Sequence, residues 1–232
     1  MDVQTIFQRY EIKYFLTTKQ LQHLKECMQP YMEADAYGKS TILNLYFDTP
    51  NDLLIRHSLE KPVYKEKLRL RSYHIPDGST PVFLEIKKKY DSVVYKRRES
   101  ASYDKMLGYL EQGTSFSDSQ IMHEIDYFMH YYKNLTPHVF LSYEREAFYQ
   151  KGNSDFRITF DKNILWRTKD LSLTKGAYGN SLLPENTVLM EIKTAGGIPL
   201  WFSHYLNEEH LQKCSFSKYG TVYRNLQEQK EQ

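Results

Sequence analysis

The sequence predicts an α+β fold in which an antiparallel β-sheet closes into a β-barrel, with helices packed outside it. Three observations support this prediction. Segments that alternate with period two recur along the chain, their polar faces are rich in Lys and Arg, and the helical segments between them are amphipathic. A barrel accommodates all three, because a wet interior can hold the charged faces while helices cover the apolar outside.

The first elements follow from alternation and capping signals. Residues 6–16 alternate and are predicted to form a strand. Thr17 or Thr18 caps a helix that extends to Met28, and Pro30 ends it. Residues 41–47 (TILNLYF) are typical of a second strand. A turn follows, leading into a brief helix over 53–57.

A meander of three strands is predicted next, and it carries most of the basic residues. Residues 64–74 place four cations on one face, and the Pro76-Asp77-Gly78 turn leads into a return strand over 81–89. A second turn leads into a third strand over 93–100. The four cations of the first strand are Lys65, Lys67, Arg69 and Arg71.

The rest of the chain combines helices with further strands. Apolar positions at helical spacing indicate two helices, over 103–110 and 121–132, and a third over 199–210. Residues 166–186 are expected to form a loop-rich segment. The further strands are predicted over 138–149, 155–161 and 187–194, and a last helix over 217–226.

Composition and length exclude several classes of protein. The 232 residues include 31 Lys and Arg against 29 Asp and Glu, and the length fits one domain over 1–232 with a polar tail over 227–232. No apolar run approaches the roughly 18–20 residues of a membrane span, and no signal peptide is visible. Cys27 and Cys214 are too few for a disulfide scaffold, so a reduced, cytoplasmic protein is expected.

The charges are unevenly placed although the net charge is only +2. Residues 61–98 hold eleven Lys and Arg but four acids. Closing a sheet around so many cations is costly unless carboxylates and a bound polyanion compensate. The pattern therefore predicts a site for phosphate chains, in which a glutamate holds a metal. Three strands carry Glu-x-Lys, with both charges on one face: Glu11/Lys13, Glu85/Lys87 and Glu191/Lys193.

The ordered segments RYEIKY, KLRLRSY, FLEIKKK, YKRRE, SYERE, DFRITFD, MEIKT and SFSKY resemble the VTC domain. This is the polyphosphate-polymerase branch of the triphosphate tunnel metalloenzymes, which include the CYTH triphosphatases. The match runs from about residue 6 to about residue 224. It implies a tunnel of antiparallel strands, a C-terminal plug helix, a divalent Mn²⁺ or Mg²⁺, and transfer of the γ-phosphate of ATP to a growing polyphosphate chain.

The resemblance also implies roles for individual residues. Arg69, Arg71, Lys87 and Lys96 would bind ATP and polyphosphate, and Glu191 would bind the metal, with Glu11 or Glu85 as a second ligand or as the partner that orients a lysine. The residues that the resemblance places in catalysis are Lys13, Arg69, Arg71, Lys87, Lys96, Arg145, Arg157 and Lys218. Arg145 has the same parity as Val139, Leu141 and Tyr143, so an inward position there requires a bulge.

Two positions depart from the family pattern. Ser215 stands where the plug helix of the VTC domain has its first lysine, and Lys213 is offset from it. Arg9 stands where the triphosphatase branch has the first glutamate of E-x-E-x-K, which favours the polymerase branch.

Other functions remain open at this stage. A tunnel triphosphatase differs only in its acceptor, and a binding module would hold polyphosphate or inositol phosphates without turnover. A nucleic-acid-binding barrel is a further alternative, but the basic residues suit an enclosed bore better, so no nucleic-acid partner is expected. The chain has no membrane segment of its own, and a membrane-protein partner stays open.

Overall fold

The structure is a computed structural model that describes residues 10–91 and 93–231. Within these residues the fold is α+β, as predicted. The helices are α1 (Thr18–Met28), α2 (Leu53–Leu59), α3 (Tyr103–Gln112), α4 (Gln120–Tyr132), α5 (Leu200–Glu208) and α6 (Lys218–Glu231), with a 3-10 turn, η1 (Leu173–Lys175). The strands are β1 (Tyr10–Thr17), β2 (Met32–Asp48), β3 (Tyr64–Ser72), β4 (Pro81–Tyr90), β5 (Val93–Ser102), β6 (Thr136–Gln150), β7 (Asn153–Arg167), β8 (Asn180–Ser181), β9 (Thr187–Thr194) and β10 (Lys213–Cys214).

The strands form one large sheet in the order β10-β1-β9-β7-β6-β2-β3-β4-β5, with β8 paired to β7. The pairs for which a register is defined are antiparallel. The order of the described strands is open, with β10 and β5 at its ends. The predicted antiparallel sheet is therefore confirmed, but no pairing among the described strands closes it into the predicted barrel.

The chain divides into two compact units. Of the described residues, unit 1 contains 10–40, 143–164 and 183–216, and unit 2 contains 41–91, 93–142, 165–182 and 217–231. Strands β2, β6 and β7 contribute residues to both units. The expectation of a single domain over 1–232 stays a prediction.

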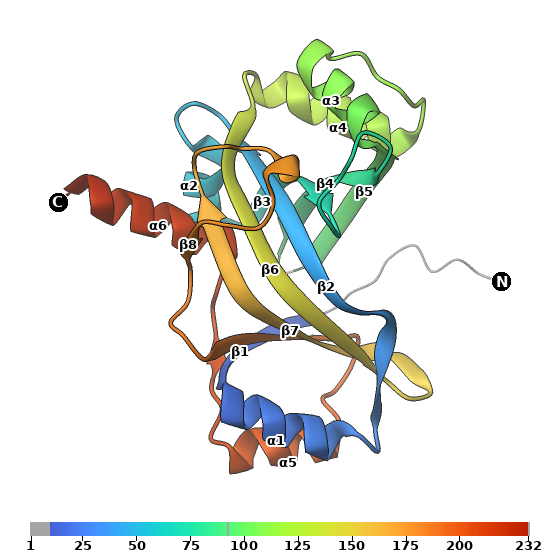
Figure 1. The fold of residues 1–232 in the computed structure, drawn as a ribbon, viewed down its shortest axis with the longest axis vertical. Coiled ribbons are helices and arrows are strands. Elements are labelled where there is room, and N and C mark those ends of the chain that lie inside the picture. The colour runs from blue at the N-terminus through green and yellow to red at the C-terminus, as the bar shows by residue number, and fades with distance from the viewer. Residues whose placement is uncertain (1–9, 92, 232) are drawn as a thin grey trace. The chain divides into compact units, whose positions relative to one another are not determined.

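In unit 1, β1 pairs with β9, and β9 pairs with β7. One face of these strands is apolar and packs against α1 and α5, which lie side by side (Figure 1). Thr17 caps α1 as predicted: its hydroxyl accepts a hydrogen bond from the backbone N–H of Gln20, whose side chain accepts one from the N–H of Thr17. The core includes Leu16, Leu24, Met190 and Phe202.

In unit 2, strands β3 to β5 form the predicted meander, and β2 pairs with β3. The apolar face of these strands packs against α3 and α4 (Figure 1). The core residues alternate along each strand, as in Leu68 and Leu70 of β3 and Leu84 and Ile86 of β4. Burial of these positions at full depth stabilises the sheet by about 2 kcal/mol per large side chain. The opposite, polar face of the same strands carries the cations that the sequence singled out.

Several predicted boundaries were wrong. Strand β2 begins at Met32 rather than at residue 41, and β7 continues to Arg167. The polar tail over 227–232 is helical to Glu231, because α6 extends through it. Of the strand predicted over 6–16, residues 6–9, which include Arg9, lie outside the described part of the chain. None of the described helices is long and apolar enough to cross a membrane.

Candidate active site

Side chains on the polar face of unit 2 form rows that run across neighbouring strands. Residues directly opposite each other in an antiparallel pair share a face, so the register defines the rows. Lys67 of β3 lies opposite Lys87 of β4, and Lys87 lies opposite Lys96 of β5. The next row contains Tyr46, Arg69, Glu85 and Arg98, from β2 to β5. Two of the residues with predicted roles, Lys87 and Lys96, thus share one row, and a third, Arg69, lies in the next.

Glu85 is the centre of this basic face. Its carboxylate has no exposed surface and accepts a 2.8 Å hydrogen bond from Nε of Arg69. Lys96 Nζ lies 2.5 Å from Oε1, and Nη1 of Arg71 lies 3.7 Å from Oε2. Burial alone would raise the pKa of Glu85, but Arg69, Arg71 and Lys96 together lower it to about 2. The carboxylate is therefore ionised at neutral pH and holds three cations together.

Lys96 is the cation whose charge is most sensitive to pH. Burial lowers the pKa of its ammonium, the nearby Glu85 carboxylate opposes that effect, and Arg71 adds repulsion, so that the pKa falls to about 8. A bound phosphate oxygen would favour the ammonium form. A change of pH near 8 therefore changes the charge of Lys96 at the site.

Arg71 is anchored from the other side. Its Nε donates a 3.0 Å hydrogen bond to Oδ1 of Asn44, and the amide nitrogen of Asn44 donates to the carbonyl of Leu141 at 3.1 Å. Asn44 is completely buried, so both of its polar atoms are satisfied inside the protein. Each of the two central arginines is thus held through Nε, Arg69 by Glu85 and Arg71 by Asn44.

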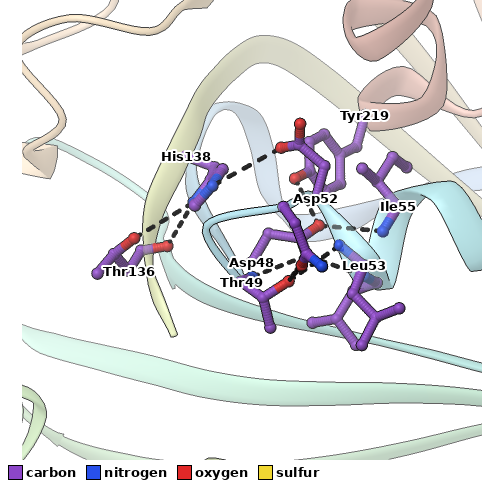
Figure 2. A network of polar contacts seen from close by, with 10 residues as sticks. Asp48, Thr49, Asp52, Leu53, Ile55, Thr136, His138 and Tyr219 are labelled. Carbon is purple, nitrogen blue, oxygen red and sulfur yellow. Dashed lines mark hydrogen bonds and ion pairs between the residues drawn. The ribbon is translucent and has the colours of Figure 1, made fainter. Parts of the chain in front are cut away.

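The start of α6 contacts this face of unit 2. Tyr219 stacks on Tyr46 with ring centroids 4.8 Å apart, and its hydroxyl donates to Oδ2 of Asp48 at 2.9 Å (Figure 2). Lys67 Nζ donates to the hydroxyl of Ser217 at 3.2 Å. Lys218, the first residue of α6, is half-buried and immediately precedes Tyr219. The helix predicted as a plug thus begins beside the row of lysines.

Unit 1 carries a second polar face, opposite its apolar core. Lys13 of β1 lies opposite Glu191 of β9, and Glu191 lies opposite Thr159 of β7. Lys13 Nζ donates to the carbonyl of Phe216 at 2.8 Å, and Lys193 Nζ lies 3.6 Å from Glu191. The neighbouring row joins Glu11, Lys193 and Arg157.

Arg145 lies on a polar face of unit 1 and forms a bidentate ion pair with Asp161. Its Nε and Nη2 donate to the two carboxylate oxygens at 2.6 and 2.7 Å. Burial lowers the pKa of the guanidinium, but Asp161 and Glu191 raise it more, and the net shift is well upward. Residues 139–143 of β6 are all buried, so alternation there does not identify a single core face, and the inward position of Arg145 stays a prediction.

Arg157 is the most exposed of the predicted tunnel residues of unit 1. Its guanidinium donates to Asp35 at 2.8 Å, and 45% of its side chain is exposed. Arg157 therefore faces a carboxylate of β2 in this structure, and its role with phosphates stays a prediction.

A divalent metal requires oxygen ligands. No three His, Cys, Asp or Glu side chains in residues 10–91 and 93–231 are grouped so as to hold one. Mg²⁺ commonly takes only one or two protein carboxylates and completes its shell with phosphate oxygens and water. Glu191, whose side chain is 10% exposed, suits that arrangement as a carboxylate ligand. Asp161 suits it less, because both of its oxygens accept hydrogen bonds from Arg145.

Comparison with solved structures defines the fold class. A candidate adenylate cyclase from Bacillus halodurans matches with a TM-score of 0.56 and 13% identity, over 91% of this chain and 94% of that one. The PH1819 protein from Pyrococcus horikoshii matches at 0.52 and 14%, over 94% and 99%. A candidate adenylyl cyclase from Hippeastrum, described as having a dominant triphosphatase activity, matches at 0.51 and 15%, over 93% and 96%. The chain therefore shares the fold of these three proteins.

Sequence comparison identifies the family within that class. The model of the VTC domain matches residues 8–227, so the chain belongs to the VTC domain family. A search of curated protein sequences finds no match. The predicted resemblance is therefore confirmed for the family and the fold.

Sequence reasoning missed several residues that hold the site together. Asn44 and Tyr46 lie in the strand TILNLYF, where a single Asn among apolar residues was the only signal. The pairing of Arg145 with Asp161 could not be read from their separation of 16 residues. Glu85 was considered only as a second metal ligand or a lysine partner, whereas the structure shows it bound to two arginines as well.

Proposed function

We propose that the protein is a polyphosphate polymerase, an ATP–polyphosphate phosphotransferase. The single observation that carries this proposal is the basic face of unit 2, where Arg69, Arg71 and Lys96 surround the buried carboxylate of Glu85 beside a row of lysines. Fixed guanidinium groups suit bidentate binding of phosphate oxygens, and ammonium groups act as point charges around them. Membership of the VTC domain family supports the same activity.

The proposed reaction needs no nucleophile from the protein. A terminal oxygen of the acceptor phosphate attacks the γ-phosphorus of ATP, the bond from that phosphorus to the β–γ bridging oxygen breaks, and ADP leaves. Such a transfer depends mainly on positioning and on stabilisation of negative charge. Arg69, Arg71, Lys87 and Lys96 would neutralise the phosphate oxygens.

The residues of unit 1 have proposed roles of their own. Glu191 would hold Mg²⁺ or Mn²⁺, and the ion would supply positive charge that stabilises the phosphate oxygens. Lys13 would contact the terminal phosphate. In unit 2, Lys218 would contribute positive charge at the start of α6. Arg145 would supply a positive charge at a fixed position, because its two hydrogen bonds to Asp161 hold the plane of the guanidinium.

A tunnel triphosphatase is the second candidate. It is favoured by the Hippeastrum protein, for which a dominant triphosphatase activity is described. The two activities share the binding of a triphosphate and differ in the acceptor, which is water in one and a phosphate chain in the other. A binding module without turnover is the third candidate.

The product formed from ATP distinguishes the three. The purified protein is incubated with ATP and Mn²⁺, and the products are separated by gel electrophoresis before and after digestion with exopolyphosphatase. A polymerase gives a long polymer that exopolyphosphatase removes and an ordinary phosphatase leaves intact. Orthophosphate without polymer supports the triphosphatase, and polyphosphate binding with neither product supports the module. The Arg69→Ala variant serves as the control, because a contaminating kinase would be unaffected by it.

A further inference from the structure

Three aromatic and polar contacts link α6 to Arg69 within unit 2. The hydroxyl of Tyr219 donates to Asp48, and the ring of Tyr219 stacks on Tyr46. The hydroxyl of Tyr46 accepts a 3.1 Å hydrogen bond from Nη1 of Arg69. Tyr219 and Tyr46 are both buried. A displacement of α6 would therefore change the position of the guanidinium of Arg69.

The carboxylate of Asp48, which accepts the hydrogen bond from Tyr219, is itself held in place by backbone N–H groups. Its Oδ1 accepts hydrogen bonds from the backbone N–H groups of Thr49 and Leu54, at 2.9 and 2.8 Å, and its Oδ2 accepts one from Ile55 at 3.0 Å (Figure 2). The bonds from Leu54 and Ile55 satisfy two N–H groups at the start of α2, whose N-cap residue, Asp52, makes no side-chain cap. The carboxylate cannot move without breaking them, so it holds the hydroxyl of Tyr219 in one direction.

The hydroxyl of Tyr219 remains a hydrogen-bond donor at all ordinary pH values. Burial and the neighbouring carboxylates of Asp48 and Asp52 raise the pKa of Tyr219 strongly. Only the protonated hydroxyl can donate to a carboxylate. The hydroxyl of Tyr219 therefore stays able to donate to Asp48 over the ordinary range of pH.

Tyr46 completes the fixation of Arg69. Glu85 binds the guanidinium at Nε and Tyr46 binds it at Nη1, so two contacts at different nitrogens define its plane. A planar guanidinium must be held in one orientation to bind two phosphate oxygens at once.

We propose that Tyr46 and Tyr219 are positioning residues for the phosphate site: Tyr219 holds Tyr46, and Tyr46 holds the guanidinium of Arg69 in the orientation that binds phosphate. This rests on the proposed function, because it assigns Arg69 to phosphate binding. It also gives α6 a role beyond carrying Lys218, since the docking of the helix sets the geometry of a strand residue.

The test measures binding of tripolyphosphate by isothermal titration calorimetry to the whole chain and its variants. Loss of one net hydrogen bond changes affinity by about fivefold, so Tyr46→Phe is expected to raise the Kd about fivefold. Tyr219→Phe keeps the stacked ring and is expected to raise it about twofold to fivefold. Tyr109→Phe is the matched control, because Tyr109 is also buried and also donates to a carboxylate, at 2.7 Å from Asp126. Tyr109→Phe is expected to leave the Kd unchanged.

A double-mutant cycle distinguishes the positioning of Arg69 from a purely structural role of the two tyrosines. In an Arg69→Ala background, Tyr46→Phe and Tyr219→Phe are expected to have no further effect on the Kd, because the group that they position is gone. Equal effects with and without Arg69, or an effect of Tyr219→Phe no larger than that of Tyr109→Phe, would overturn the positioning role while leaving the proposed function intact. A wild-type chain that does not bind tripolyphosphate would overturn both.

Discussion

The ammonium of Lys96 lies 2.5 Å from the carboxylate of Glu85, which is completely buried and also binds Arg69. One negative charge thus faces three cations, so this part of the sheet keeps a net positive charge at neutral pH. Cations held by a single carboxylate are fixed in place but not neutralised as a group. This arrangement suits a site that must attract phosphates and still release a product.

The charge of Lys96 predicts a pH dependence of phosphate binding. Its pKa is lowered to about 8, so the free protein loses this charge as the pH rises through that value. We expect polyphosphate to bind best to the ammonium form, so a bound anion should raise the pKa of Lys96. Affinity is therefore expected to be highest below about pH 8, and binding between pH 8 and 9 takes up protons.

Calorimetry in buffers of different ionisation enthalpy measures this proton uptake. Lys96→Arg is the control, since arginine stays charged over the whole range and should abolish the uptake. The same uptake in Lys96→Arg would show that another group is responsible.

The two central arginines are predicted to supply most of the binding energy. Removing a charged donor costs about 1.5–3 kcal/mol, so Arg69→Ala and Arg71→Ala should each weaken tripolyphosphate binding about 10-fold to 100-fold. Lysine at either position should recover only part of the loss, because it lacks the planar fork. Titration of tripolyphosphate at one fixed salt concentration measures the Kd.

Arg97→Ala provides the matched control for these variants. Arg97 lies on β5 opposite Ile86, on the face away from Glu85, and its Nε is 3.6 Å from Glu124. Its removal should change the Kd by less than about twofold, since an exposed ion pair contributes little. A loss as large as that of Arg69→Ala would mean that overall charge, rather than the arrangement around Glu85, determines binding.

Glu191→Gln is predicted to remove metal-dependent activity while the protein remains folded. The amide keeps the shape of the side chain but loses the charge that a divalent ion requires. Turnover of ATP is measured as a function of Mn²⁺ concentration, together with the melting temperature. Glu144→Gln is the control, because Glu144 pairs with Lys39 and Asn163 instead. Unchanged activity of Glu191→Gln at every metal concentration would exclude Glu191 as a ligand.

The pair formed by Arg145 and Asp161 is predicted to be important for stability. Asp161→Asn leaves a largely buried guanidinium without its counter-charge, which costs about 3–5 kcal/mol. Urea denaturation measures the loss of unfolding free energy. The double variant Arg145→Met with Asp161→Leu should recover much of it, because no unpaired charge remains. A loss below about 1 kcal/mol for Asp161→Asn would show that water satisfies Arg145 in solution.

The sequence was sufficient to predict the strands of the meander, because their period-two pattern is strong. Strand β9 was predicted over 187–194 and is observed as Thr187–Thr194. Strand β10 was missed, since a pair of residues has no periodicity. The first part of β2, with the sequence MEADAYGKS, was also missed, because it contains Ala, Asp and Gly, which are uncommon in strands.

The residues of the site were easier to predict than their relationships. The faces of Arg69 and Arg71 follow from alternation alone. That Lys67, Lys87 and Lys96 share one row depends on the register between strands, which a single sequence does not fix. The anchoring of Arg71 by Asn44 depends on the pairing of β2 with β3 in the same way.

The most direct test of the proposed polymerase is a phosphorus balance followed by ³¹P NMR. The protein is incubated with ATP and Mn²⁺, samples are taken over time, and the metal is removed by chelation before each spectrum. We predict that each ADP formed is matched by one phosphate in internal polyphosphate residues, with no rise in orthophosphate. ADP matched by orthophosphate instead, without polyphosphate signals, would contradict the polymerase.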